Sequence, residues 1–125
     1  MGKALTRVAL VDDDASFRKA LGRLLAASSF EITTFVSATE FLKSLEEEQS
    51  PQCLVVDFHM PELTGLDLHR RLAEVGINIP TIVITAHSTP GLRERCEGAG
   101  AAAFLEKPFD GSALIGKINS AIHYG

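Results

Sequence analysis

Short apolar runs alternate with longer amphipathic stretches along this chain. Continuous apolar or β-branched runs predict five strands, over residues 7–11, 31–36, 53–56, 81–85 and 102–106, of which the first and third are expected to be buried. Apolar residues spaced three and four apart predict five helices, with apolar faces in 17–25, 41–45, 66–75, 92–98 and 114–122. Strands and helices in this alternation form a parallel sheet covered on both faces. The pattern therefore predicts a single α/β domain, doubly wound, with five strands and five helices.

Local signals predict where the helices begin and end. Asp14 and Asp110 are interpreted as helix N-caps, and Gly76 as the stop of the third helix. Ser37 and Glu40 have the spacing of a capping box, in which each side chain accepts a hydrogen bond from the other residue's backbone amide. The apolar face of the third helix comprises Leu66, Leu68, Leu72 and Val75.

Length and charge limit the possible functions. A chain of 125 residues is about one domain, so we expect residues 1–125 to form one unit with no output domain in it. A net charge of −4 argues against binding nucleic acid through its phosphates. No stretch approaches the roughly 18 apolar residues of a membrane span, so we expect no membrane association. Cys53 and Cys96 form no CxxC pair, which favours reduced thiols and a cytoplasmic location.

The ends of the predicted strands carry the chemically informative residues. The first strand runs into three acids, the third into one, and the fourth and fifth into a hydroxyl and an ammonium. These residues are Asp12, Asp13, Asp14, Asp57, Thr85 and Lys107. Ligands of an open parallel sheet bind at this edge, so the side chains are expected to converge. Clustered carboxylates favour a cation such as Mg²⁺. With the hydroxyl and the ammonium they suit a phosphoryl group, and Asp57 is the natural nucleophile.

Four segments carry this pattern, over residues 8–14, 55–65, 82–86 and 104–109. In this order, and at these strand ends, they resemble the receiver domain of bacterial two-component response regulators over essentially the whole chain. The runs 84–87 (Ile-Thr-Ala-His) and 106–109 (Glu-Lys-Pro-Phe) are most similar to the FixJ-type regulators. The resemblance implies a flavodoxin-like, CheY-like fold with the strand order 2-1-3-4-5.

The resemblance also implies an acceptor and a metal site. Asp57 is the implied phosphoacceptor, which would form an aspartyl-phosphate. Asp13 and Asp57 are the implied direct ligands of Mg²⁺, and Asp12 assists through water. The backbone carbonyl of His59 is a further implied metal ligand, which leaves the His59 side chain free to vary.

Further residues are implied to bind the phosphoryl group and to respond to it. Thr85 and Lys107 would contact phosphoryl oxygens, and the small Ala86 would leave room for them. Thr85 and Phe104 are the implied switch, in which the aromatic ring packs inward when the hydroxyl is drawn to the phosphoryl group. Pro108 is implied to follow a cis peptide bond that aims Lys107.

The implied function is a phosphorylation-dependent signalling switch. A sensor histidine kinase would donate the phosphoryl group, and the domain would catalyse only its own phosphorylation and slow dephosphorylation. The response would shift the face made by residues 92–98, 102–106 and the last helix. The resemblance to FixJ-type regulators implies that this face controls transcription as its output. It also implies a dimer formed through the predicted helix 92–98 and the predicted strand 102–106. The chain itself is not expected to bind nucleic acid.

Two alternatives stay open at this point. The acids at 12–14 contain a D-x-D after an apolar strand, as in haloacid-dehalogenase-type phosphatases. That family needs an acidic pair after a late strand, where this chain has Lys107. A non-phosphorylated interaction module on the same fold is the second alternative. The histidines do not pair at a zinc-ligand spacing, and the resemblance suggests that His59 and His87 tune hydrolysis of the acyl phosphate.

Overall fold

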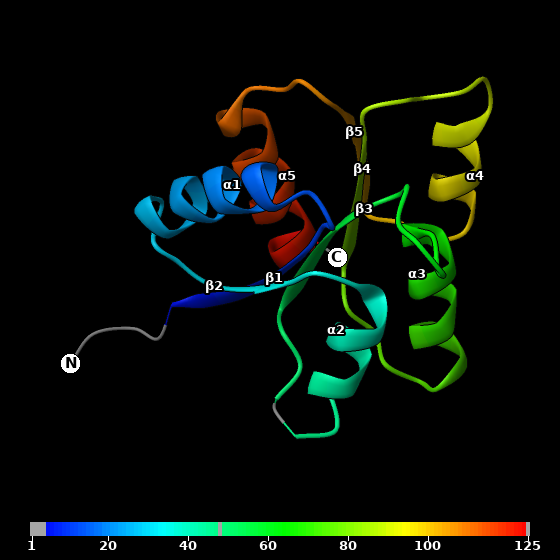
Figure 1. Ribbon diagram of the computed structural model, residues 1–125, viewed down its shortest axis with the longest axis horizontal. Coiled ribbons are helices and arrows are strands. Elements are labelled where there is room, and N and C mark those ends of the chain that lie inside the picture. The colour runs from blue at the N-terminus through cyan, green and yellow to red at the C-terminus, as the bar shows by residue number, and fades with distance from the viewer. Residues whose placement is uncertain (1–4, 48, 125) are drawn as a thin grey trace.

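The computed structural model describes residues 5–47 and 49–124, and within these ranges strands and helices alternate as the sequence pattern predicts (Figure 1). The strands are β1 (Thr6–Val11), β2 (Phe30–Phe35), β3 (Cys53–Asp57), β4 (Thr81–Thr85) and β5 (Ala103–Glu106). The helices are α1 (Ala15–Ala27), α2 (Ala38–Ser44), α3 (Gly65–Glu74), α4 (Leu92–Gly98) and α5 (Gly111–Tyr124).

The strands form one parallel sheet in the order β2-β1-β3-β4-β5, which confirms the expected strand order. The chain starts in the middle of the sheet at β1, adds β2 on one side, and then crosses to β3 and proceeds to β5. The crossing makes β1 and β3 neighbours with their carboxyl ends adjacent. Ligand sites of open parallel sheets lie at such a reversal of direction.

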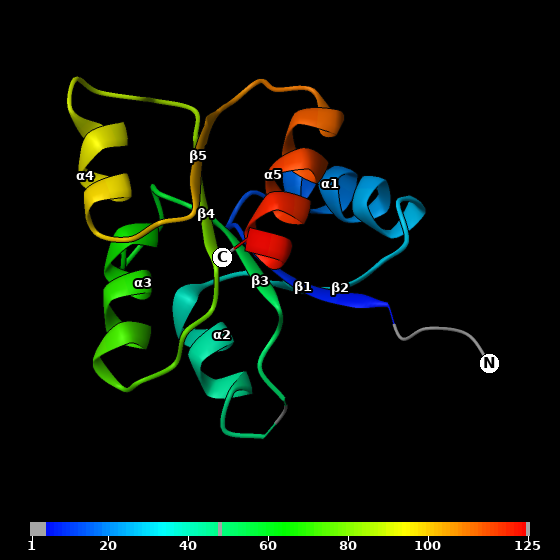
Figure 2. The ribbon, with the colours of Figure 1, turned by 180° about the vertical axis from the view of Figure 1, so that it is seen from behind.

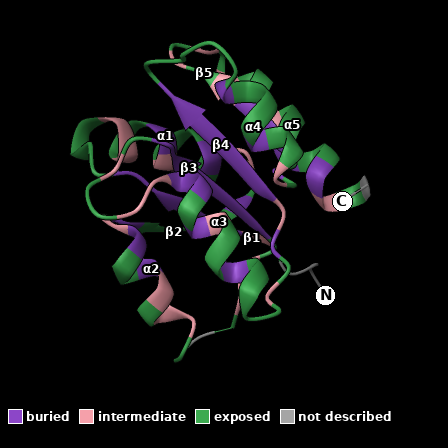
Figure 3. Ribbon diagram, turned by 90° about the vertical axis from the view of Figure 1, so that its right-hand side faces the viewer, coloured by how far each residue is buried: buried purple, intermediate pink, exposed green. Residues whose placement is uncertain are grey.

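Two apolar layers hold the helices on the sheet. Successive strand side chains point to opposite faces, so Val8 and Leu10 enter one layer and Ala9 and Val11 the other. The first layer packs against α1 and α5, and the second against α2, α3 and α4. Figures 1 and 2 show the two groups of helices on opposite sides of the strands, and Figure 3 shows the buried strands between them.

Several element boundaries differ from the sequence-based expectation, among them the start of β1 at Thr6 instead of Arg7 and the end of β3 at Asp57 instead of Val56. β2 spans 30–35 instead of 31–36, because Val36 is 46% exposed and leads directly into the cap of α2. β5 begins at Ala103 instead of Ala102. Val75 is 68% exposed and is the C-cap of α3, so its assignment to the buried helix face is wrong. Gly76 follows with φ +77°, a backbone conformation that glycine adopts easily and that ends the helix.

The helix starts confirm one predicted cap and correct another. The Asp14 carboxylate accepts a hydrogen bond from the Phe17 amide at 3.1 Å, as an N-cap does. Ser37 accepts from the Glu40 amide, but the Glu40 carboxylate accepts from Val36 instead of from Ser37. The reciprocal capping box lies elsewhere, at the start of α3, between Thr64 and Asp67.

The described helices include none that is long and apolar enough to cross a membrane. Cys53 and Cys96 are both buried and free, as the sequence predicts. Burial raises the pKa of the Cys53 thiol to about 12, which keeps this residue unreactive at neutral pH.

Gly65 brings the start of α3 against the end of β3. A Cβ atom at this position would lie 2.8 Å from the backbone oxygen of Asp57 and 3.2 Å from a methyl group of Val56. The Gly65 amide also donates a hydrogen bond to the Phe58 carbonyl at 3.0 Å. Only a residue without a side chain allows the helix this close to the strand end that carries Asp57.

We expect Gly65→Ala to lower the free energy of unfolding by about 2 kcal/mol, because the added methyl group overpacks against backbone that cannot move away. Gly116→Ala is the matched control, since a Cβ atom there meets nothing within 4 Å. In the interior of α5 this control should raise the free energy of unfolding by up to about 1 kcal/mol. Urea denaturation measures both, and equal effects of the two substitutions would contradict the steric account.

Candidate functional site

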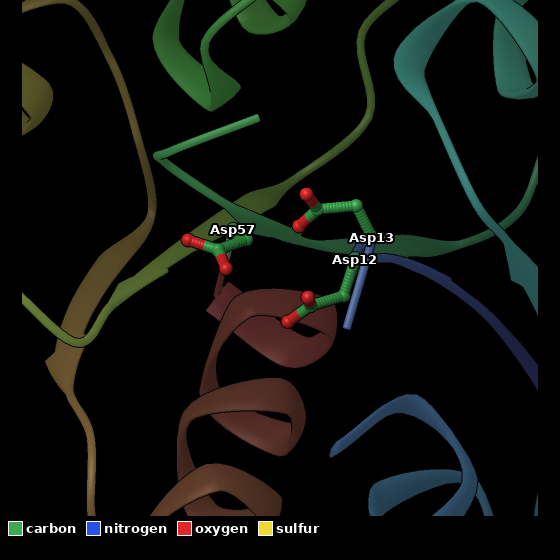
Figure 4. A group of neighbouring side chains, drawn as sticks. All are labelled: Asp12, Asp13 and Asp57. Atoms are coloured by element: carbon green, nitrogen blue, oxygen red, sulfur yellow. The ribbon is translucent and has the colours of Figure 1, made fainter. Parts of the chain in front are cut away.

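The carboxyl ends of β1 and β3 bring three acids together, as the sequence pattern predicts. One carboxylate oxygen each of Asp12, Asp13 and Asp57 lies within 4.8 Å of the others (Figure 4). Asp12 and Asp57 are buried and Asp13 is exposed. The site therefore combines a shielded interior with one solvent-facing carboxylate.

Backbone donors fix the two buried carboxylates. The Asp14 amide donates a hydrogen bond to Asp12 Oδ1 at 2.9 Å, and the His59 amide donates to Asp57 Oδ1 at 3.1 Å. Arg18 of α1 donates to the backbone oxygen of Asp12 at 2.7 Å, which ties the β1–α1 junction to the helix. Each buried acid thus keeps its other oxygen, Oδ2, for the interior of the site.

Lys107 joins the carboxylates from the end of β5. Its Nζ lies 3.0 Å from Asp12 Oδ2 and 3.2 Å from Asp57 Oδ2, with the lysine side chain 14% exposed. The Lys107 amide donates to the Thr85 carbonyl at 2.7 Å, so the backbone of β4 holds the residue in place. The peptide bond between Lys107 and Pro108 is cis, as the resemblance implies.

Burial and charge act in opposite directions on the two groups of this ion pair. Burial raises the pKa of Asp12 above its ordinary value, and hydrogen bonds from the Asp14 amide and Lys107 offset only part of that effect. Burial by itself lowers the pKa of Lys107, but the hydrogen bond and charge of Asp12 and the charge of Asp57 outweigh it, so the net direction is upward. The ammonium is therefore firmly charged, while Asp12 bears the cost of being ionised in the interior.

The end of β4 contributes a hydroxyl on the other side of Asp57. Thr85 is fully buried, and its Oγ1 accepts a hydrogen bond from the His87 amide at 3.1 Å. The hydroxyl proton of Thr85 is left to donate. Ala86 follows at an exposed position.

Phe104 lies one strand further, on β5, with its ring 1% exposed in the layer below α4. It is the register partner of Val83 on β4, two residues before Thr85. The Arg93 guanidinium of α4 lies over the ring, with Cζ 5.1 Å from the ring centroid. Phe104 therefore connects the strand that carries Thr85 with α4.

Comparison with known proteins agrees with this geometry. The sequence model of the response regulator receiver domain family matches residues 8–119 of this chain. The chain belongs to the response regulator receiver domain family.

Relatives and solved structures support the assignment of this receiver domain. It is 38% identical to the response regulator protein TmoT of Ectopseudomonas mendocina, over 90% of this chain and 51% of TmoT. It is 37% identical to the transcriptional regulatory protein FixJ of Rhizobium meliloti, over 91% of this chain and 55% of FixJ. The crystal structure of FixJ-N superposes with a TM-score of 0.87 at 34% identity, covering 100% of this chain and 98% of that one. The receiver domain thus spans about half the length of the curated relatives.

The family resemblance, the fold and the receiver assignment are thereby confirmed. The structure brings the acids, Thr85 and Lys107 to one edge of the sheet, as expected. The carboxylates are hard oxygen donors at a spacing that suits a divalent cation. The roles of the individual residues stay predictions.

The two histidines beyond the strand ends meet over the receiver site. His59 Nε2 lies 3.2 Å from the backbone oxygen of His87, and because a carbonyl only accepts, this nitrogen carries the proton. The ring, the His87 backbone and the Thr85 hydroxyl form a hydrogen-bonded path between the β3–α3 and β4–α4 loops. Sequence reasoning placed both histidines near the site but missed this contact.

We expect Asp12→Asn to raise the free energy of unfolding of the metal-free domain at pH 8, because the buried Asp12 carboxylate is costly to ionise and asparagine carries no charge. The pKa of Asp12 is raised in the folded state, so its ionised form costs stability above that pKa. The stability gained by Asp12→Asn should shrink as the pH falls below the pKa of Asp12 in the folded state. The Asp12 carboxyl of wild type is then neutral, like the asparagine amide.

Asp14→Asn is the control for this pH dependence, because Asp14 is exposed and asparagine is an equally good N-cap. Urea denaturation in a chelator at several pH values measures both variants. An Asp12→Asn domain less stable than wild type at pH 8 would show that the ion pair with Lys107 outweighs the cost of burial.

Proposed function

We propose that this receiver domain accepts a phosphoryl group on Asp57 from the phosphohistidine of a sensor kinase. The observation that carries the proposal is the position of Asp57. Its side chain is 11% exposed, lies among two further acids, and contacts the Lys107 ammonium at 3.2 Å. A nucleophilic carboxylate beside an ammonium suits transfer of an electron-rich phosphoryl group.

In the proposed transfer, an Asp57 oxygen forms a bond to phosphorus while the bond from phosphorus to the imidazole nitrogen of the donor breaks. The departing electron pair stays on that nitrogen. Lys107 exchanges its contact with Asp57 for a phosphoryl oxygen, and the Thr85 hydroxyl donates to another. The small Ala86 leaves room for the group. Two of the three phosphoryl oxygens would thus meet a cation or a donor from this chain's side chains.

Asp12, Asp13, Asp57 and the backbone carbonyl of His59 are the residues that would hold Mg²⁺. Their oxygen chemistry and the 4.8 Å spacing of the carboxylates fit a cation that keeps several water ligands. When bound, Mg²⁺ neutralises charge on the carboxylates and on the phosphoryl oxygens. The domain would act on its own phosphoryl group only, with slow hydrolysis of the acyl phosphate.

The response to phosphorylation is proposed to pass from Thr85 to Phe104. A hydroxyl drawn to the phosphoryl group leaves its place beside β5, and the buried ring of Phe104 then repacks below α4. The affected face is that of α4, β5 and α5. A phosphoryl group that favours one of two packings shifts their populations by its differential contacts.

Control of transcription is the output that the relatives support. FixJ is a transcriptional regulatory protein, and this domain corresponds to about half of it. We propose that the phosphorylated domain dimerises through α4 and β5, and that any contact with DNA is made outside residues 1–125. The free, buried thiols are consistent with the cytoplasm as the site of action.

The acceptor assignment is tested with acetyl phosphate or beryllofluoride in the presence of Mg²⁺. Wild type should be modified, whereas Asp57→Asn should not, because an amide oxygen is a poor nucleophile. Asp14→Asn is the matched control and should be modified like wild type. Intact-protein mass spectrometry measures the phosphorylated form, and labelling of Asp57→Asn at the wild-type level would refute the assignment. Steady release of phosphate from a general phosphatase substrate would favour a phosphatase instead.

The dimer is tested by sedimentation of the domain with and without beryllofluoride and Mg²⁺. We expect the mass of wild type to double on addition and that of Asp57→Asn to stay monomeric, because only the former takes up the phosphoryl mimic. An activated wild-type domain that remains monomeric at about 100 μM would contradict a dimer interface of the size stable complexes use.

A further inference from the structure

The Lys107 ammonium has a third neighbour besides the two carboxylates. Its Nζ lies 3.8 Å from the centroid of the Phe17 ring, within the range of a cation–π interaction. Asp12 Oδ2 at 3.0 Å and Asp57 Oδ2 at 3.2 Å are the other two contacts. The ammonium is therefore held between two negative oxygens and the negative face of an aromatic ring.

Phe17 is itself fixed by the elements that build the site. It lies in the first turn of α1, where its amide donates to the Asp14 cap at 3.1 Å. Its ring meets the Phe109 ring edge-to-face, with centroids 6.2 Å apart and planes at 84°. Phe109 follows Lys107 by two residues, so the start of α1 and the segment after β5 lock against each other around the lysine.

A lysine needs such support more than a shorter residue would. Its side chain has four rotatable bonds and carries about 2 kcal/mol of rotamer entropy when free. Both carboxylates that attract the ammonium are also candidate partners of a cation and of the phosphoryl group. When Asp12 and Asp57 interact with a cation or a phosphoryl group, their attraction for the Lys107 ammonium changes. The attraction of the Phe17 ring for the ammonium does not.

We propose that Phe17 is a positioning residue for phosphoryl transfer, which holds the Lys107 ammonium at the phosphoryl position through its aromatic face. The role in phosphoryl transfer rests on the proposed function of Asp57. The contact between the Phe17 ring and the Lys107 ammonium does not, and it can be tested separately. The competing interpretation is that Phe17 only fills space, since it also packs against the apolar layer below α1 and α5. Leucine at this position would fill most of that space without the aromatic face.

The structural test uses the unphosphorylated domain with no phosphodonor. The Phe17 ring current should shift the Lys107 Cε protons upfield in an NMR spectrum of the ¹³C-lysine-labelled domain. Phe17→Tyr should keep this shift, and Phe17→Leu should abolish it while the other lysine signals stay in place. Unshifted Lys107 Cε protons in wild type, or a shift that persists in Phe17→Leu, would overturn the proposal.

The rate test measures phosphorylation of the domain by acetyl phosphate at saturating Mg²⁺. Phe17→Leu should lower the phosphorylation rate by roughly three- to tenfold, the factor expected from losing a partly buried cation–π contact. Phe17→Tyr, which keeps an aromatic face, should have a rate within about twofold of wild type. In a Lys107→Met background, Phe17→Leu should cause no further fall, because the positioned group is already absent.

The outcomes separate this proposal from the proposed function. An equal fall in the Lys107→Met background, or a fall in Phe17→Tyr as large as that in Phe17→Leu, would show that Phe17 acts by packing and would overturn the inference. Thermal unfolding of each variant accompanies the rates, so loss of fold is recognised. If wild type itself were not phosphorylated, the function of Asp57 would fail, while the NMR test would still decide whether the ring holds the lysine.

Discussion

Three carboxylates and one ammonium share the edge of the sheet, and their balance of charge governs what this receiver domain can do. Burial makes the ionised Asp12 unfavourable, and the Lys107 ammonium is the positive group that offsets it in the interior. A phosphoryl group or a divalent cation would change this balance directly. The carboxylates and the lysine lie at the ends of β1, β3 and β5, so the site is assembled only when these strands come together in the sheet.

The apolar runs predicted the architecture because the central strands β1, β3 and β4 have both faces covered, whereas the edge strand β2 is buried only at Phe30 and Phe35. The layers below α1 and α5 and below α2, α3 and α4 cover these central strands, so their sequences are continuously apolar. The strand ends then located the site, since a parallel order puts all carboxyl ends at one edge. The boundary errors at Val36 and Val75 arose where an apolar residue is exposed, which periodicity by itself does not detect.

What the sequence did not predict are contacts between residues that come together only in the fold. Helical spacing assigned Phe17 to the inner face of α1 but gave no information about the lysine over its ring. The approach of Gly65 to the Asp57 carbonyl and the His59–His87 contact likewise join different elements. The capping box at Thr64 and Asp67 had a readable signal, a hydroxyl three residues before an acid, which sequence reasoning missed.

The ion pair between Asp12 and Lys107 joins residues 95 positions apart, at the ends of the first and fifth strands. A growing chain on the ribosome holds the acids long before it holds the lysine. Until β5 docks, the Lys107 ammonium is absent from the site. The carboxylates then repel one another without this counter-ion, and the Phe17 ring has no ammonium to contact. The complete set of side chains at this edge therefore exists only once the last strand of the sheet has docked, and a chain that ends before β5 lacks the ammonium that would meet a phosphoryl group on Asp57.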